Sequence, residues 1–454
     1  MRQVGVIVGP QRIRHARMGG GRQCPEDHDE SQGEAAAGRH GGRLSPTAPA
    51  SRAVRGWRSV TRLRGDVRTS PAGGRAVGSS PRREVSMRAA VLVSVGEPLE
   101  IAELELGAPQ QGEVRVRLAA SGVCHSDLSL VEGRVPYLTP VVLGHEGAGV
   151  VEAVGSGVTR VSPGDHVVIA WVPNCGHCFH CLRGERHLCL TAVRRQGRMD
   201  DGGTRFQRDG VPVFHGLDAA TFAEATVVRE SAVVRIDPGI PLATAALVGC
   251  AVTTGVGAAL HTAGIRPGER VVVIGCGGVG LSAVMGCRLA GAERIVAVDP
   301  VAERRQAALR LGASEAFEPE EAADAVMELT SGIGADAVFE VVGRPELQRQ
   351  AWEMTRRGGR TVLVGVAAIG VETSLPSLAL AISERQIRGC YYGSAFPERD
   401  FPAILSLYRA GRLDLDALIS QRLPLDGVND ALDAMRRGEH LRTVLTLGDE
   451  GRTA

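Results

Sequence analysis

Short apolar runs, broken by glycine and proline, fill the chain between about residue 87 and residue 251. The runs at 113–118, 150–154 and 166–170 are rich in β-branched residues and have the length of strands. Closely spaced short strands with turn residues between them are typical of an antiparallel, barrel-like domain. We therefore expect a mostly β domain over residues 87–251.

A different pattern begins after Thr253, where apolar runs alternate with stretches rich in alanine, leucine and arginine. The runs at 270–274, 294–298, 335–342 and 360–366 are almost continuously apolar. Strands of this kind are buried on both faces and belong to a parallel sheet covered by helices. The pattern predicts an α/β domain with a doubly wound parallel sheet over 252–392. Residues 393–454, with one helix near 400–409, are expected to pack back on the first domain.

The first 86 residues carry much arginine, glycine, serine and proline and have no sustained hydrophobic period. Such a composition predicts disorder. We interpret the segment as a dispensable extension or a mis-called start, with the true start at Met87. A nucleic-acid-binding tail and a transit peptide are the alternatives, and acidic residues between Glu26 and Glu34 argue against the second.

Composition places the chain among globular proteins. It has 454 residues, of which 44% are hydrophobic and 23% charged, and a net charge of +1. All basic side chains other than histidine are arginine, which we attribute to a GC-rich genome. No apolar run approaches the roughly eighteen residues of a membrane span, and no secretory leader opens the sequence. We expect a cytoplasmic protein.

The cysteines point to metal sites rather than disulfides. The chain has 10 cysteines, and four of them form the pattern C-x2-C-x2-C-x7-C in one short loop. Four thiolates at this spacing suit a closed, tetrahedral structural zinc. Buried thiols and a zinc ribbon are the alternatives, but ribbons place their two cysteine pairs farther apart. The predicted structural ligands are Cys175, Cys178, Cys181 and Cys189.

A second set of metal ligands comes from three separate segments. Cys124, His145 and Cys250 form a mixed set that leaves a fourth position open, where a bound water or alcohol loses its proton near neutral pH. Asp127 is placed to orient one of these ligands by a hydrogen bond. For Cys124 and His145 taken alone, ordinary core packing is the competing interpretation. The polar residues that flank both of them favour a catalytic zinc.

A glycine-rich motif follows the apolar run 271–274. Glycines at this point let the backbone approach a pyrophosphate at the N-terminus of the next helix. Asp299 ends the following strand, where a carboxylate can bind the ribose diol and repel a 2′-phosphate, although it could instead only cap a helix. The motif predicts NAD rather than NADP, with Arg304 as an adenosine-side contact. The glycines are Gly275, Gly277, Gly278 and Gly280.

These motifs together resemble the zinc-dependent medium-chain alcohol dehydrogenases over essentially all of 87–454. Besides the two ligand sets and the glycine motif, the resemblance includes the sequence 249–255, the sequence 339–343 and the sequence 441–444. It implies a GroES-like catalytic domain joined to a Rossmann domain, with the substrate between them. It also implies two zinc ions per chain, and the insertion 198–222 implies a homodimer.

The resemblance assigns further roles. It implies that Glu146 lies behind the catalytic zinc, that Ser126 passes the alcohol's proton outward, and that Trp171 lines the alcohol channel. Helix capping is the alternative for Ser126, and core filling the alternative for Trp171. Further contacts to the cofactor are implied for His125, Val279, Thr254 and Arg442.

The predicted function is reversible hydride transfer between an alcohol and NAD, with an aldehyde or ketone as the product. A close alternative is oxidation of a thiol adduct of formaldehyde, which His125 favours and Ser126 disfavours, since that branch usually has threonine there. A non-catalytic zinc protein that binds nucleic acid through the arginine-rich extension is a third possibility. The intact ligand sets and glycine motif argue against it.

Overall fold

The computed structural model describes residues 84–448, apart from the side chains of 193 and 194, and all of them belong to one compact unit. Nearly all of the predicted extension 1–86, including Cys24, therefore lies outside the described residues. The first strand, β1 (Val85–Leu92), begins slightly before Met87. The sequence boundary at 87 thus falls inside a strand.

A small closed barrel forms one part of the N-terminal half. Its strands, in order, are β1, β2 (Glu100–Leu106), β7 (Phe206–Arg208), β8 (Val211–His215) and β4 (Val141–Val142). Alternate residues of β2 are buried, as the period of two along its sequence requires. Met87, Leu104 and Phe206 fill the space that the barrel encloses.

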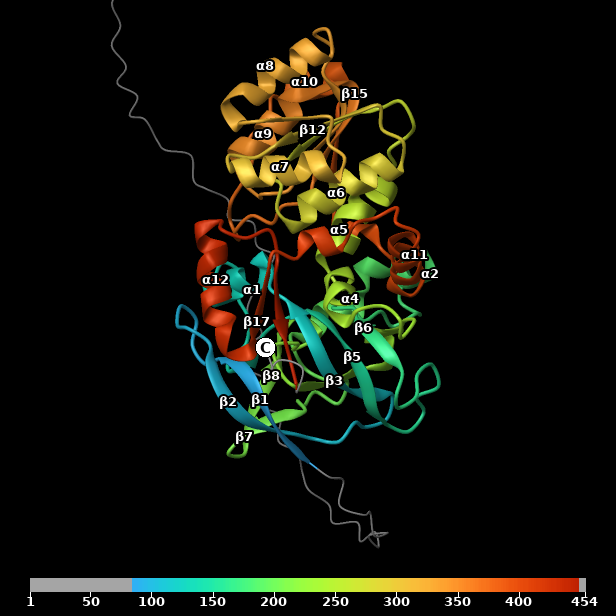
Figure 1. Cartoon of the computed structure of the whole chain (residues 1–454), viewed down its shortest axis with the longest axis vertical. Helices are drawn as coiled ribbons and strands as arrows, with labels where there is room; N and C mark the ends of the chain where they lie inside the picture. The colour runs from blue at the N-terminus through green and yellow to red at the C-terminus, as the bar shows by residue number, and fades with distance from the viewer. Residues whose placement is uncertain (1–83, 449–454) are drawn as a thin grey trace, which may run out of the picture. The chain divides into compact units, whose positions relative to one another are not determined.

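A larger sheet lies beside the barrel and supplies most of the site. Its order is β10 (Val233–Arg235), β6 (His166–Ile169), β5 (Glu146–Val154), β3 (Glu113–Gly122), β18 (Thr443–Thr446) and β17 (Gln421–Pro424), and β9 (Ala225–Arg229) also pairs with β3. Strand β18 comes from the far end of the chain and runs antiparallel to β3, with Val444 opposite Gly122. Red elements of the C-terminal segment accordingly lie among blue and green ones in Figure 1.

The part of the chain predicted to bind the nucleotide is a six-stranded parallel sheet. Its order is β13 (Glu315–Phe317), β12 (Arg294–Val298), β11 (Arg270–Ile274), β14 (Ala335–Glu340), β15 (Thr355–Leu363) and β16 (Gln386–Gly389). The central strands are buried on both faces, which explains their unbroken apolar sequence. The predicted α/β class is confirmed. The connecting helices are α6 (Gly278–Leu289), α7 (Ala302–Leu311), α8 (Pro319–Leu329), α9 (Pro345–Met354) and α10 (Ser377–Ser383).

Two helices, α4 (Leu242–Val248) and α5 (Ala251–Gly257), join the β part to the parallel sheet, and α5 packs against α6. The C-terminal segment contains α11 (Pro397–Arg409) where the sequence predicts a helix. It also contains a second helix, α12 (Val428–Arg437), which the sequence analysis did not predict. Smaller elements near the site are α1 (His125–Val131), α2 (Phe179–Leu182), α3 (Leu190–Arg195), η1 (Arg186–Leu188) and η5 (Tyr392–Ser394).

Within residues 84–448, no single helix is long and apolar enough to cross a bilayer. One bent pair of helices, Leu242–Val248 with Ala251–Ala263, has the length and composition of a span, and on those two grounds only.

His215, at the end of β8, is buried and stacks on Phe206 with ring centroids 4.6 Å apart. Neither ring nitrogen has a hydrogen-bond partner among the described residues, and burial lowers the pKa of the ring to about 3. The unfolded chain, with an ordinary pKa near 6.5, binds a proton that the folded protein excludes. Stability is therefore full above about pH 6.5 and falls as the pH falls toward 3, by about 1.4 kcal/mol per pH unit from this group.

We expect His215→Leu to flatten this acid limb, because leucine fills a similar volume and does not titrate. Urea unfolding of both proteins between pH 4.5 and 7.5 measures the difference in slope. Zinc ligands titrate equally in both proteins and cancel in that difference. Equal slopes would show that His215 does not destabilise the folded state in acid.

Candidate active site

Cys124, His145, Glu146 and Cys250 meet in one buried cluster, with one donor atom from each lying within 4.8 Å of the others. Cys124 follows β3 and precedes α1, His145 directly precedes β5, and Cys250 directly precedes α5. Three loops at strand and helix ends thus bring the separate sequence motifs together. The three residues that the sequence analysis grouped as ligands are therefore adjacent in space.

Asp127 orients this cluster. Its Oδ1 lies 3.1 Å from His145 Nδ1 and accepts a hydrogen bond from Gly144 N at 3.0 Å, and its Oδ2 accepts from Cys124 N at 3.3 Å. His145 Nε2 is buried and has no partner among the described residues. A histidine fixed through one nitrogen, with the other directed at two thiols, has the arrangement of a metal ligand. These residues fit a zinc ion.

The thiols of the cluster have perturbed acidities. A hydrogen bond from Cys250, and after it the hydrogen bond and charge of His145, hold the pKa of Cys124 well below its usual value. A thiolate is the form that binds metal. The hydroxyl of Ser126, in the first turn of α1, lies 3.8 Å from Cys124 Sγ. The structure therefore places Ser126 beside the cluster of Cys124, His145 and Cys250.

The second cluster contains Cys175, Cys178, Cys181 and Cys189, whose sulfur atoms all lie within 4.8 Å of one another. We call residues 175–189 the cysteine loop. The amides of Cys178 and Cys175 each donate to a sulfur of the loop at 3.3 Å. Backbone donors of this kind stabilise thiolates, so this donor set also fits zinc.

We call the cluster of Cys124, His145 and Cys250 the mixed cluster. Glu146 and Arg442 form a buried ion pair next to it. Burial raises the pKa of Glu146 to about 7, although Arg442 opposes the rise. The same arginine packs against the start of α6, where a Cβ built on Gly278 would lie 2.3 Å from Arg442 Cδ. Arg442 Nε is buried and has no partner in the described part of the chain. One side chain thus connects the mixed cluster to the glycine motif.

The glycine motif has the geometry that its sequence predicts. Gly275 has φ +95°, and a Cβ on Gly280 would lie 1.8 Å from the Gly275 carbonyl oxygen. The helix α6 begins at Gly278, with Val279 in its first turn, so its free amides face the loop. Thr254 lies in α5, which packs on α6.

Asp299 lies at the end of β12 and is buried. Its carboxylate accepts from Cys276 N at 2.8 Å and from Val301 N at 2.9 Å. Helix α7 begins only at Ala302, after Val301 as N-cap, so Asp299 braces the glycine loop rather than capping that helix. Arg304 Nη1 lies 4.0 Å from Asp299 Oδ2, and Arg304 Nη2 donates to the Gly438 carbonyl at 3.0 Å.

Two guanidinium groups and one imidazole converge near the start of α6. The pKa of His125 is lowered, first by desolvation and then by the charges of Arg442 and Arg304. The residue His125 is nevertheless solvent-exposed, so its ring can still reach a ligand. Two guanidinium groups beside helix amides are typical of an anion site. It lies where a pyrophosphate is expected.

An aromatic wall borders the metal cluster. The ring of Trp171 contacts those of His145 and Tyr391 edge to face, with ring centroids 5.9 Å and 5.3 Å apart. It contacts the tilted ring of Tyr392 at 4.7 Å between centroids. The Tyr392 hydroxyl donates to the carbonyl of Gly249, next to Cys250. The sequence interpretation named Trp171 but missed both tyrosines. The available signal was their position beside Gly393, shortly after the end of β16 at Gly389.

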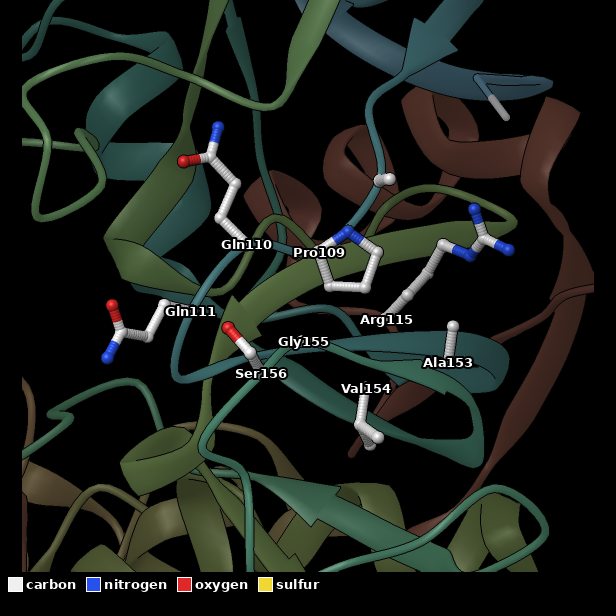
Figure 2. Close-up of a pocket in the computed structure, with 9 residues that line it drawn as sticks. Pro109, Gln110, Gln111, Arg115, Ala153, Val154, Gly155 and Ser156 are labelled. Carbon is white, nitrogen blue, oxygen red and sulfur yellow. The ribbon is translucent and has the colours of Figure 1, made fainter. Parts of the chain in front are cut away.

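A surface cavity of about 380 Å³ lies elsewhere, at the outer ends of β3 and β5. In Figure 2 the amides of Gln110 and Gln111 point in different directions. Arg115, which also lines the cavity, pairs with Glu152 at 2.7 Å. The cavity shares no residue with either cysteine cluster. We therefore place the chemistry at the mixed cluster.

Comparison with known proteins agrees with this geometry. Residues 110–238 match the alcohol dehydrogenase GroES-like domain, and residues 278–410 match the zinc-binding dehydrogenase family. The chain is 42% identical over 363 residues to an NDMA-dependent alcohol dehydrogenase of Amycolatopsis methanolica, covering 79% of this chain and 98% of the relative. The chain belongs to the zinc-dependent medium-chain alcohol dehydrogenases. This dehydrogenase is also 39% identical over 371 residues to the S-(hydroxymethyl)glutathione dehydrogenase of Paracoccus denitrificans, covering 79% and 99%.

Solved structures give the same result for the fold. The dehydrogenase matches benzyl alcohol dehydrogenase of Acinetobacter calcoaceticus with TM-score 0.77 and 30% identity, over 80% of this chain and all of that one. It matches an alcohol dehydrogenase zinc-binding domain protein of Burkholderia ambifaria with TM-score 0.77 and 34% identity, over 81% and 100%. The predicted family and the GroES-like and Rossmann architecture are confirmed.

Proposed function

We propose that this alcohol dehydrogenase uses NAD as hydride acceptor, binds two zinc ions per chain, and prefers alcohols that carry an aromatic or other flat apolar group. The observation that carries the proposal is the buried set of Cys124, His145 and Cys250, which Arg442 connects to the glycine loop. Bound zinc and NAD would supply Lewis acidity toward the alcohol oxygen and acceptance of the hydride.

The chain's own residues would prepare the alcohol for this reaction. Asp127 holds His145 in a fixed orientation and keeps Nε2 unprotonated for the metal. The Ser126 hydroxyl is placed to take the proton of the alcohol toward solvent, with His125 behind it. Trp171 and Tyr391 exclude water on one side of the reacting carbon, which strengthens the electrostatic interactions there. Arg442, His125 and Arg304 would hold the pyrophosphate.

The test uses the purified full chain. We expect about two zinc ions per chain and formation of reduced nicotinamide with NAD, with benzyl alcohol a better substrate than ethanol. Each assay is run with and without NDMA, because a relative is named for dependence on it. A single zinc per chain would refute the ligand assignment. Two zinc ions without alcohol turnover under any condition would refute the proposed reaction.

We expect Asp299→Ala to lower the preference for NAD over NADP, measured as the ratio of kcat/KM values, by at least about tenfold. The carboxylate accepts hydrogen bonds from the ribose diol and repels a 2′-phosphate. Asp324→Ala, which removes an exposed carboxylate from α8 of the same domain, is the matched control. If both variants kept the wild-type ratio, Asp299 would not select the coenzyme, and Arg304 would become the next residue to test.

A second candidate is oxidation of an S-hydroxymethyl thiol, favoured by the Paracoccus denitrificans relative. Formaldehyde supplied with and without a low-molecular-weight thiol separates the two. Turnover that requires the thiol and exceeds that of every free alcohol would make this second activity the principal one.

A homodimer and a cytoplasmic location complete the proposal. Strand β16 lies at the edge of the parallel sheet, and the apolar side chains around it are strongly exposed. Exposed apolar surface along a sheet edge favours pairing with a second copy. Sedimentation equilibrium measures the mass. The exposed apolar side chains around β16 are Val366, Ile369, Leu378, Ile382 and Ile387.

The thiols of the two cysteine clusters require a reducing compartment such as the cytoplasm.

A further inference from the structure

We propose that Asn174, Arg186 and Glu398 form a clamp through which the cysteine loop fixes the aromatic wall of the substrate pocket. They would act as positioning residues for the reaction of bulky aromatic alcohols. The inference rests on the proposed function and extends it, because it assigns to the structural zinc loop a role in substrate selection.

The clamp is built around a buried amide. Asn174 is 5% exposed, and its Nδ2 lies 3.1 and 3.4 Å from the two carboxylate oxygens of Glu398. Its Oδ1 accepts from Arg186 Nη1 at 3.1 Å. Both ends of the amide are therefore engaged, one by an anion and the other by a cation. This arrangement fixes the orientation of Asn174 and holds Glu398 against the cysteine loop.

Further contacts join the same two segments. The guanidinium of Arg186 lies 4.0 Å from the ring centroid of Phe396, a cation–π contact. Arg160 Nη2 reaches Glu398 Oε1 at 3.5 Å. The short helix η1 of the cysteine loop packs directly against η5, which contains Tyr392. The cysteine loop, together with Asn174 directly before it, thus contacts the segment 392–398 at several points, among them the bond between the buried Asn174 amide and the partly buried Glu398 carboxylate.

Each side of the clamp leads along the chain to the aromatic wall. Asn174 and Cys175 come shortly after Trp171, and only Val172 and Pro173, both buried, lie between Trp171 and Asn174. On the other side, the amide of Ser394 donates to the Tyr391 carbonyl at 3.0 Å. The resulting tight turn connects the tyrosines to Phe396 and Glu398. The clamp therefore sets the distance between Trp171 and Tyr391.

That distance matters because aromatic contacts are short-ranged. Trp171 and Tyr391 contact edge to face at 5.3 Å, a geometry favourable only within a narrow range. Tyr391 is also 43% exposed, so the protein covers its side chain only in part. A loosened clamp would separate the rings and weaken binding of an aromatic ring. A small alcohol such as ethanol would depend mainly on the metal and cofactor.

The test exchanges the amide and the carboxylate between positions 174 and 398 in the full-length zinc-loaded enzyme. Asn174→Asp places a carboxylate against Glu398, and the double variant Asn174→Asp with Glu398→Gln restores one donor–acceptor pair with reversed polarity. We expect the single variant to raise KM for benzyl alcohol about five- to tenfold, with kcat and the kinetics on ethanol changed less than about twofold. The double variant should recover most of the loss.

Two readouts are independent of turnover. Zinc should remain at the wild-type level in both variants, and the tryptophan fluorescence of Asn174→Asp should shift to the red as Trp171 separates from Tyr391, with reversal in the double variant. Arg183→Ala is the matched control, because it removes a cation–π contact with Phe179 from the exposed side of the cysteine loop. It should change neither readout nor the KM ratio.

Three results would overturn the clamp. These are unchanged fluorescence and KM ratio in Asn174→Asp, failure of the double variant to recover them, or zinc loss with an equal decline on all alcohols. The proposed function fails separately, if the wild-type enzyme oxidises no alcohol. In that case the fluorescence shift and its reversal still decide whether the clamp exists.

Discussion

Cys250→Ala is expected to leave one zinc ion per chain and to lower kcat/KM for alcohols on the order of 1000-fold. Cys250 is one of three protein ligands in the mixed cluster, and two remaining ligands cannot hold zinc in a fixed, open geometry. The cysteine loop shares no residue with that cluster and should keep its own ion. Elemental analysis and initial rates of nicotinamide reduction measure the two effects on the same preparation.

Cys287→Ala provides the matched control, because Cys287 is equally buried but lies in α6, outside both clusters. It should retain two zinc ions and wild-type rates. Retention of two ions in Cys250→Ala would mean that Glu146 replaces the lost ligand. Full activity in that variant would exclude the mixed cluster as the catalytic centre.

Arg442→Met is expected to lower the free energy of unfolding by about 3–5 kcal/mol, because it leaves the Glu146 carboxylate buried without its partner. Methionine retains much of the apolar contact with Gly278 but removes the charge. The buried carboxylate would then have to take up a proton or distort the cluster. Urea denaturation at neutral pH, followed by circular dichroism, measures the loss.

Adding Glu146→Gln to Arg442→Met should recover more than half of that stability, since no uncompensated charge remains. Activity should stay low in both variants, because each also lacks the pyrophosphate contact that we propose for Arg442. If the double variant were as unstable as Arg442→Met, the arginine would stabilise the fold by packing alone. Glu146→Gln by itself completes the double-mutant cycle.

The sequence predicted those features whose pattern is local. The parallel sheet was recognisable because strands buried on both faces have continuous apolar sequences, as in β11 and β12. The cysteine loop was recognisable because its four thiols lie within one short segment. The mixed cluster required more, since Cys124 and Cys250 are far apart in sequence, and there the resemblance to a known family supplied the grouping.

Other features depend on pairings between distant segments. Nothing in the sequence of 443–446 specifies β3 as its partner, and the contact between Trp171 and Tyr391 follows only from the way these segments meet. Helix α12 is different, because its signal was present. Val428, Ala431, Leu432 and Met435 follow helical spacing, and the first three are buried. The mixed texture of the surrounding loops obscured this period.

Strand β18 has a consequence for biosynthesis. It pairs with β3, yet the ribosome makes it after the entire parallel sheet. The nascent segment of the parallel sheet can fold as soon as it emerges, whereas the earlier β segment must wait with residues 120–122 of β3 lacking a partner strand on one side and Glu146 without its arginine. Chains that stall before residue 442 would therefore expose an incomplete sheet, a ready target for chaperones and proteases.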